Sequence, residues 1–277
     1  MQMTAKADSG RFQSGADKYA AYLETPEGRL RCDVAFANLQ DFLPLPQTKL
    51  LLRALDLGCG TGVAAVRLAR LGIHITLLDS SPAMLETAKR AAREAGVTDK
   101  FVLHHGDATR LTSLFHAAAF DVILCHNVLE YVDDPIAVLR GAARALRDSS
   151  AILSVLVRNR SGEVFRAAIQ AGDLAVAEST ITAECGQESL YGGPVRLFTS
   201  DSLQAMLKAV SLTVIAERGV RVLADYLPPR ISRSAEYSRI FELERKLGTR
   251  PEFAAVARYV QIIARHSCAP SGEETGP

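Results

Sequence analysis

Three glycines and three aspartates within the first 107 residues have the types and spacing of a nucleotide-binding site. The segment 54–62 reads ALDLGCGTG, so an apolar strand containing Asp56 leads through three glycines into a helix. Glycine lets the backbone turn sharply and approach a ligand closely, and a helix start presents free N–H groups. Asp79 and Asp107 follow the next two expected strands, where carboxylates can accept hydrogen bonds from ribose hydroxyls and an adenine amino group.

The spacing of the glycines separates this loop from two other nucleotide-binding loops. The dinucleotide fingerprint G-x-G-x-x-G/A has a small residue three positions after its second glycine, where this chain has Val63. The Walker-type loop requires Gly-Lys-Ser/Thr, which is absent. A tight strand-to-helix turn without a ligand is the alternative explanation.

The arrangement D-x-G-x-G-x-G at a strand end resembles the loop that binds S-adenosylmethionine (SAM) in class I methyltransferases. The segments 105–108 (HGDA) and 120–135 (FDVILCHNVLEYVDDP) resemble the same superfamily. The resemblance implies SAM as cofactor, S-adenosyl-L-homocysteine as product, and an α/β, Rossmann-like, seven-stranded sheet with helices on both faces. It implies that the cofactor is bound by Asp56, Gly58, Cys59, Gly60, Gly62, Asp79, Ser80, Met84, Asp107, Ala108, Cys125 and His126.

Nearly the whole chain is also similar to the bacterial tRNA 5-carboxymethoxyuridine methyltransferases, which esterify the carboxylate of a modified wobble uridine. The most specific matches are the segments 126–131 (HNVLEY), 219–222 (GVRV) and 225–227 (DYL). The family's lysine-rich stretch after strand five is replaced here by residues 184–196, which are not basic, and its tryptophan by Tyr131. Because lysine and arginine supply most of the affinity for phosphates, these departures favour a small metabolite over tRNA.

Short apolar runs alternate with helical stretches through most of the chain. Alternation of this kind predicts right-handed crossovers and a parallel sheet. The expected helices are 62–71, 80–95, 135–146 and 202–210. The expected strands are 51–57, 73–78, 101–104, 121–125, 151–157, 212–218 and 258–264.

The chain is expected to consist of two terminal tails, an N-terminal helical cap and a catalytic domain. Residues 1–15 are expected as a disordered tail, and residues 16–46 as an N-terminal helical cap broken at 25–28. The methyltransferase domain is expected at 47–266 and a second disordered tail at 267–277. Polar insertions are expected after strands five and six, at about 158–199 and 220–253.

Methyl transfer from a sulfonium is an in-line displacement, which depends more on alignment than on acid catalysis. A carboxylate acceptor needs no base, whereas a hydroxyl, amine or carbon acceptor benefits from one. His126 is the first candidate for orienting or deprotonating the acceptor, followed by Glu130 and Tyr131. Packing is the alternative role for His126, and a surface helix start is the alternative for the other two.

Several basic and aromatic residues could complete the site. Arg31, on the N-terminal helices, could bind the SAM carboxylate, with Tyr22 beside it. Arg221 would suit an anionic acceptor, unless it pairs with Asp225. The residues expected to contact the acceptor are Arg221, Tyr226, Arg196 and Tyr19.

The composition limits partners and location. The chain has 277 residues, 48% of them hydrophobic, and a formal net charge of +1, so no global attraction to a polyanion is indicated. Five scattered cysteines without C-x-x-C spacing argue against disulfides and metal, and favour a reducing cytoplasm. No stretch approaches the ~20 apolar residues that span a bilayer. The oligomeric state is not indicated.

Three functional hypotheses follow from these patterns. The leading one is a SAM-dependent methyltransferase acting on an oxygen, nitrogen or carbon of a small, anionic or aromatic metabolite. The second has the same chemistry with a wobble uridine in tRNA as the acceptor. The third is a non-catalytic SAM-binding partner subunit.

Overall fold

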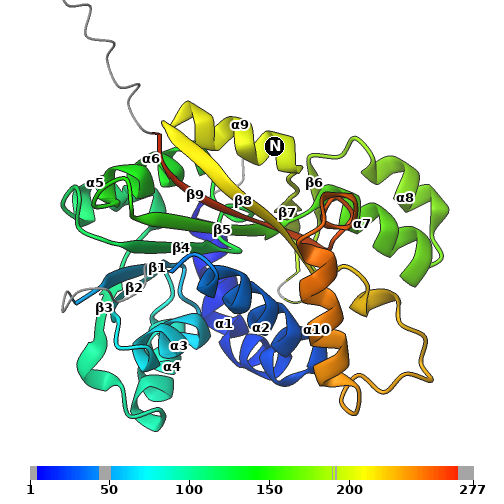
Figure 1. Cartoon of the computed structure of the whole chain (residues 1–277), viewed down its shortest axis with the longest axis horizontal. Helices are drawn as coiled ribbons and strands as arrows, with labels where there is room; N and C mark the ends of the chain where they lie inside the picture. Colours follow the sequence, from blue (N-terminus) through cyan, green and yellow to red (C-terminus); the bar gives the residue numbers. More distant parts are fainter. Residues whose placement is uncertain (1–4, 44–50, 189, 191, 268–277) are drawn as a thin grey trace, which may run out of the picture.

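The computed structural model describes residues 5–43, 51–188, 190 and 192–267. A seven-stranded sheet forms its centre (Figure 1). The strands are β1 (Arg53–Leu57), β2 (His74–Asp79), β3 (Phe101–His105), β4 (Val122–His126), β5 (Ile152–Arg158), β8 (Leu212–Val220) and β9 (Tyr259–His266). Their order is β3-β2-β1-β4-β5-β9-β8. This is the α/β, Rossmann-like sheet that the sequence predicts, and its strand order reverses beside β1, where such sheets form a binding crevice.

Strand β9 corrects the expectation of a fully parallel sheet. It runs antiparallel to both β5 and β8, whereas β1 to β5 pair in parallel. The chain leaves β8 at the carboxyl edge of the sheet and returns to the same place, because Arg258 N donates to Arg221 O at 2.9 Å. A strand that starts at the carboxyl edge has to run backwards through the sheet.

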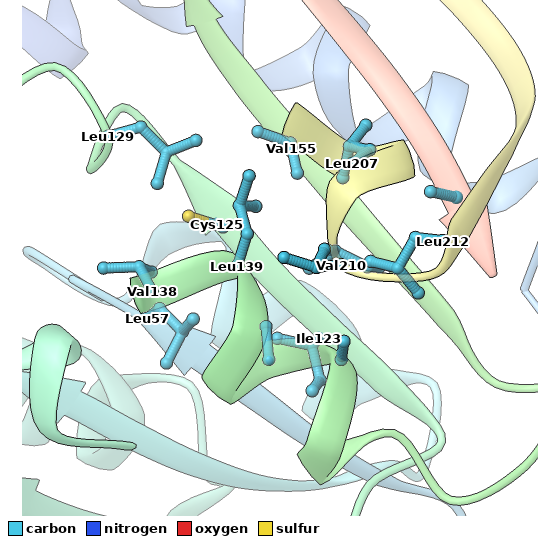
Figure 2. Close-up of a cluster of buried hydrophobic side chains, with 14 of the residues drawn as sticks. Leu57, Ile123, Cys125, Leu129, Val138, Leu139, Val155, Leu207, Val210 and Leu212 are labelled. Atoms are coloured by element: carbon cyan, nitrogen blue, oxygen red, sulfur yellow. The ribbon is translucent and has the colours of Figure 1, made fainter. Parts of the chain in front are cut away.

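Apolar runs in the strands are buried by helices on both faces. All seven residues of β5 are buried. One face packs against α5 (Leu111–Leu114), α6 (Pro135–Ala145) and α9 (Ser200–Ala209). Figure 2 shows this cluster, with Leu139 of α6 and Leu207 of α9 beside the strands. The opposite face packs against α3 (Val63–Arg70) and α4 (Pro82–Glu94).

Two helices, α1 (Ala5–Glu24) and α2 (Pro26–Gln40), precede the sheet. Thr25 begins α2 by accepting a hydrogen bond from Gly28 N at 3.1 Å, which accounts for the break expected at 25–28. The tail expected at 1–15 is wrong for residues 5–15, which belong to α1, because no proline interrupts the chain before Pro26. The boundary expected between residues 46 and 47 lies outside the described residues, as do residues 268–277 of the expected tail.

The two insertions contain regular structure of their own. The first holds α7 (Arg160–Phe165), a π-helical turn η3 (Arg166–Gln170), α8 (Leu174–Thr180) and the hairpin of β6 (Cys185–Gln187) and β7 (Pro194–Arg196). The second holds the 3-10 turn η4 (Ala224–Tyr226), α10 (Tyr237–Gly248) and α11 (Pro251–Ala254). Two further 3-10 turns are η1 (Thr98–Lys100) and η2 (Ala108–Arg110).

Helix α10 packs against α2 through a cluster that includes Leu30, Val34 and Ile240, so the second insertion and the N-terminal helices support each other. In the part of the chain that the structure describes, no helix has both the length and the apolar character needed to cross a membrane.

Candidate active site

The carboxyl ends of the parallel strands open into a cavity of about 840 Å³. The loops after β1, β2, β3 and β4 form one wall, and α1, α2, both insertions and the start of β9 form the others. Ligand cavities commonly measure roughly 300–1,000 Å³, so this one lies in the upper part of that range.

The loop after β1 requires glycine for conformational and steric reasons. Gly58, Gly60 and Gly62 have positive φ angles of 59°, 52° and 76°, which other residues rarely adopt. A Cβ on Gly58 would lie 2.6 Å from Val128 Cγ2, and one on Gly62 would lie 2.9 Å from Ala88 Cβ. Gly58 and Gly60 line the cavity, whereas Gly62 begins α3 where it packs against α4. Gly62, expected among the cofactor-binding residues, is therefore placed behind the cavity wall.

Three other residues expected to bind the cofactor also lie behind the wall. Asp56 and Cys59 border a smaller void of about 60 Å³ behind the glycine loop, and Cys125 is fully buried in the core. Burial, followed by the charge of Asp79, raises the pKa of Asp56 to about 7. Burial also raises the pKa of the Cys125 thiol. Side chains alternate between the two faces of a strand, so only some residues near a strand end can reach its ligand.

Asp79, the last residue of β2, is fixed by backbone hydrogen bonds. Its Oδ2 accepts from Gly60 N at 2.9 Å and its Oδ1 accepts from Ser81 N at 2.8 Å. Ser81 begins α4 by accepting from Met84 N, so Asp79 is not needed as the cap of that helix. Asp79, Ser80 and Met84, three of the residues expected to bind the cofactor, all line the cavity.

Asp107 holds the equivalent position after β3. Its Oδ1 accepts hydrogen bonds from Thr109 N and Thr109 Oγ1, both at 2.8 Å. These bonds fix the carboxylate while Oδ2 takes no part in them. Asp107 and Ala108 both line the cavity, next to Asp79 and the glycine loop.

The loop after β4 is organised by Asn127, which lies in the segment 120–135 that resembles the superfamily. Its φ is 55°, an uncommon value for a residue other than glycine. Its Oδ1 accepts from Arg31 Nη1 at 3.2 Å, and its Nδ2 donates to Glu130 Oε1 at 2.9 Å. The same Oε1 accepts from Arg158 N at 2.9 Å. Glu130, expected as catalytic, is buried outside the cavity wall and holds neighbouring segments together.

His126 and Tyr131, the other two expected catalytic residues, do line the cavity. His126 Nε2 lies 2.8 Å from Ser154 Oγ, and burial, followed by Arg31, lowers the pKa of the imidazole to about 3. Tyr131 donates its hydroxyl to Glu188 Oε2 at 3.0 Å, and burial, followed by Glu188, raises the pKa of the phenol. Both side chains are therefore neutral at physiological pH.

Arg31, from α2, is a buried cation with uncharged neighbours. It is 6% exposed, and its Nη2 donates to Tyr19 OH at 2.7 Å. Its guanidinium also lies over the Tyr22 ring, 5.2 Å from the centroid. Among the described residues no carboxylate pairs with it. A buried guanidinium that has no carboxylate partner and lines a cavity suits an anionic ligand group such as the SAM carboxylate.

Arg221 begins a loop whose backbone is fixed by hydrogen bonds to a buried carboxylate of α10. Its φ is 61°, it pairs with Asp225, and its Nη1 donates to Tyr22 OH at 3.0 Å. Glu244 of α10, fully buried, accepts the backbone N–H groups of the three residues after Arg221 at 2.6, 3.0 and 2.8 Å. Arg221 thus pairs with Asp225, the alternative role considered for it, and it also lines the cavity.

Tyr259, at the start of β9, lies among four arginines. Burial raises the pKa of its phenol, but Arg31, Arg158, Arg258 and Arg221 together lower it to about 8. Each of these arginines is at least nine-tenths buried and lines the cavity. Together with Tyr259 they form what we call the arginine wall. Of its five members, Arg31 and Arg221 were selected as site residues from the sequence.

Two of the four residues expected to contact the acceptor lie off the cavity wall. Tyr226 directs its hydroxyl to Gly162 O at 3.5 Å, and Arg196 donates to Asp133 O at 3.4 Å. Tyr19 and Arg221 line the cavity. Tyr226 is the last residue of the 3-10 turn η4, and its hydroxyl is bonded to α7 through Gly162 O. Arg196 is the last residue of β7 and is bonded to the loop after β4 through Asp133 O.

A family model described as "Methyltransferase domain" matches residues 49–209, more than half of the chain. The tRNA 5-carboxymethoxyuridine methyltransferase of Escherichia coli (strain K12) is 28% identical over 264 residues, which cover 92% of this chain and 95% of that protein. The ubiquinone biosynthesis O-methyltransferase of Maricaulis maris (strain MCS10) is 36% identical over 118 residues, 43% of this chain and 45% of that protein.

Among solved structures, a SAM-dependent methyltransferase from Thermotoga maritima, described as a possible histamine N-methyltransferase, has the same fold. Its TM-score is 0.61 at 16% identity, with 94% of this chain and 99% of that chain covered. The sheet order, the glycine loop and the family match agree, and the chain belongs to the methyltransferase domain family as a SAM-dependent methyltransferase.

Proposed function

We propose that the enzyme transfers the methyl group of SAM to a carboxylate oxygen of a small acidic metabolite and forms a methyl ester. The observation that carries the proposal is the arginine wall, whose effect on Tyr259 lowers the pKa of a buried phenol to about 8. A site that stabilises the anionic form of a buried phenol relative to its ordinary state would also stabilise another oxyanion, such as a carboxylate.

The residues on the opposite wall fit the cofactor. Asp79 would accept the ribose hydroxyls, and Asp107 with Ala108 would bind the adenine, as these positions do in nucleoside sites after strand ends. Arg31, one member of the arginine wall, would pair with the carboxylate of the methionine part, which leaves Arg158, Arg221 and Arg258 for the acceptor. When bound, SAM supplies the methyl group and a sulfonium leaving group; the chain's own residues hold and align it.

The side chains that could act as a base support an acceptor that arrives ionised. His126 has a pKa lowered to about 3, Tyr131 has a raised pKa and donates to Glu188, and Glu130 is off the wall. A hydroxyl or amine acceptor would benefit from a base poised near the working pH. A carboxylate is already a nucleophile at neutral pH and needs orientation only.

The charges around the opening favour a small acid over a nucleic acid. The first insertion, 158–199, holds four arginines, no lysine and five Asp or Glu residues. Glu27, Asp133 and Asp134 border the cavity, and the last two are exposed. Phosphate backbones are bound by clustered Lys and Arg, and acidic side chains at an entrance repel them.

A wobble uridine of tRNA is the second candidate acceptor. The similarity to the E. coli tRNA enzyme over 92% of this chain favours it, and it carries a carboxylate as well. Both candidates therefore share the ester chemistry and differ in the size of the acceptor.

Labelled SAM separates the two candidates. The protein is incubated with methyl-labelled SAM and either a small-molecule extract or bulk tRNA that lacks the terminal methyl ester. Label in the small-molecule fraction, absent with an Asp79→Ala variant, is the expected result. Label that enters tRNA and no small molecule would overturn the preference for a metabolite.

A further inference from the structure

A line of buried polar side chains crosses the sheet behind His126. It runs from Asn38 of α2 through Gln261 of β9 and Ser154 of β5 to the imidazole on β4. Asn38 is 1% exposed, and both Gln261 and Ser154 are 0% exposed. Buried polar groups of this kind cost stability unless they are hydrogen-bonded, so each bond in the line has a defined direction.

The direction of the first bond follows from a carbonyl group. Gln261 Nε2 donates to Ala35 O at 3.0 Å, and a backbone carbonyl can only accept. This fixes the orientation of the Gln261 amide, and Asn38 Nδ2 donates to its Oε1 at 3.1 Å in agreement. The second hydrogen of Nε2 then donates to Ser154 Oγ at 3.0 Å.

The direction of the last bond follows from the serine. Ser154 Oγ accepts from Gln261 and has one proton to donate. Among the described residues its other polar neighbour is His126 Nε2, at 2.8 Å. A hydroxyl oxygen can accept two hydrogen bonds, but if Nε2 were the donor the buried hydroxyl proton would have no acceptor among the described residues. The hydroxyl therefore donates to Nε2, which has to carry a lone pair. The proton of the neutral imidazole is then on Nδ1, for which no described residue provides a hydrogen-bond partner.

We propose that Gln261 and Ser154 are positioning residues that hold His126 as the Nδ1–H tautomer, so that the imidazole donates a hydrogen bond to the acceptor carboxylate. The inference rests on the proposed function for the identity of the acceptor, but the tautomer itself does not depend on it. His126 lines the cavity together with the arginine wall, so an N–H donor there adds to the anion-binding groups. Its lowered pKa keeps the imidazole neutral. The hydrogen bond from Ser154 then determines which ring nitrogen carries the proton.

The tautomer can be read from the histidine ¹⁵N resonances of the apo protein at pH 7. Protonated and unprotonated ring nitrogens have well-separated shifts, and His126 is assigned by comparison with a His126→Asn variant. We expect the proton on Nδ1. A proton on Nε2 in the wild-type protein would overturn the proposal, whatever the acceptor is.

Two variants test whether Gln261 and Ser154 set the tautomer of His126. Gln261→Leu and Ser154→Ala should redistribute the proton between the two nitrogens and raise KM for the acceptor roughly ten-fold, the loss typical of one hydrogen bond to a charged group. KM for SAM should stay unchanged. Gln204→Leu, which removes a glutamine bonded to Ser200 and Glu217 away from the cavity, should change neither.

The tautomer of His126 and the identity of the methylated product can be measured independently, so this inference and the proposed function can fail separately. An unchanged tautomer in folded Gln261→Leu and Ser154→Ala would overturn the positioning role even if methyl esters are the product. An Nδ1–H tautomer that the variants disturb would support the role even if the acceptor were not a carboxylate. If the variants unfold, the wild-type spectrum still decides which nitrogen carries the proton.

Discussion

The cavity has two halves of opposite construction. The cofactor half consists of Gly58, Gly60, Asp79 and Asp107, which follow three neighbouring strands and carry negative charge on a short stretch of sequence. The acceptor half is the arginine wall without Arg31, which is proposed to bind the SAM carboxylate; its positive charge comes from β5, the second insertion and the residue before β9. The half proposed to bind the cofactor is local in sequence, and the half proposed to choose the acceptor is assembled from distant segments.

The two halves also differ in how their charges are stabilised. Asp79 and Asp107 are held by backbone N–H groups within two residues or within the adjacent glycine loop. Arg158 and Arg221 are held by carboxylates, Glu188 and Asp225, from their own insertions. Substitutions in one half should therefore change one ligand's binding with little effect on the other.

The largest expected effect is on the cofactor half. Asp79→Ala removes the proposed acceptor of the ribose hydroxyls and the carboxylate that accepts from Gly60 N and Ser81 N, so we expect SAM affinity to fall roughly 100-fold or more. Calorimetric titration of SAM measures it. Asp99→Ala, at a side chain that is 74% exposed, is the matched control and should bind SAM as the wild type does. Unchanged affinity in folded Asp79→Ala would contradict the placement of the cofactor.

Asp56, which lies behind the glycine loop, tests whether a buried carboxylate there carries a cost in stability. Its pKa is raised to about 7 in the folded protein, against 3.8 ordinarily, so its contribution to stability is greatest below pH 4 and declines as the pH rises to 7. Asp56→Asn should raise the free energy of unfolding of the apo protein by up to roughly 4 kcal/mol at pH 8. Denaturant unfolding should show equal stabilities at pH 4; a variant equally or less stable at pH 8 would refute this reading.

Arg221 tests the acceptor half. Arg221→Lys keeps the charge but loses the planar fork that reaches Tyr22 and Asp225, so KM for the acceptor should rise roughly ten-fold. SAM binding should be unchanged, as measured by titration. Arg230→Lys, at an exposed position in the same insertion, is the control. A loss of SAM affinity as large as the rise in KM would remove the distinction between the halves.

The smallest expected effect is at Asn127, which joins the halves through Arg31 and Glu130. Asn127→Gly keeps the positive φ without strain and removes only the side chain, so SAM affinity should fall a few-fold. Asn127→Ala should unfold more easily than Asn127→Gly by about 1 kcal/mol, because alanine is strained at this φ. Equal stabilities of the two variants would show that the backbone at Asn127 is not a constraint.

The cofactor half could be predicted from the sequence because its residues occur at regular intervals after strands. The spacing indicated Gly58, Gly60, Asp79 and Asp107, and each of them lines the cavity. The pattern could not show that Gly62 lies behind the wall, since that depends on the contact between α3 and Ala88 of α4.

The acceptor half could be predicted only where a family motif covered it. Arg221 lies in such a motif, but Tyr259 reaches the cavity because β9 is antiparallel and starts at the carboxyl edge. A periodic pattern of apolar residues gives the position of a strand and not its direction. Asn127 lies in the segment 120–135 that resembles the superfamily, but the pattern does not show that its side chain joins Arg31 to Glu130.

The central claim is that the acceptor half receives a carboxylate. The direct measurement is the fraction of transferred label that mild alkali releases from the product as volatile methanol. Methyl esters hydrolyse under these conditions, whereas methyl ethers, methylamines and methyl groups on carbon do not. We expect nearly all the label to be released as methanol. Label that stays with the product after alkali would contradict a carboxylate acceptor.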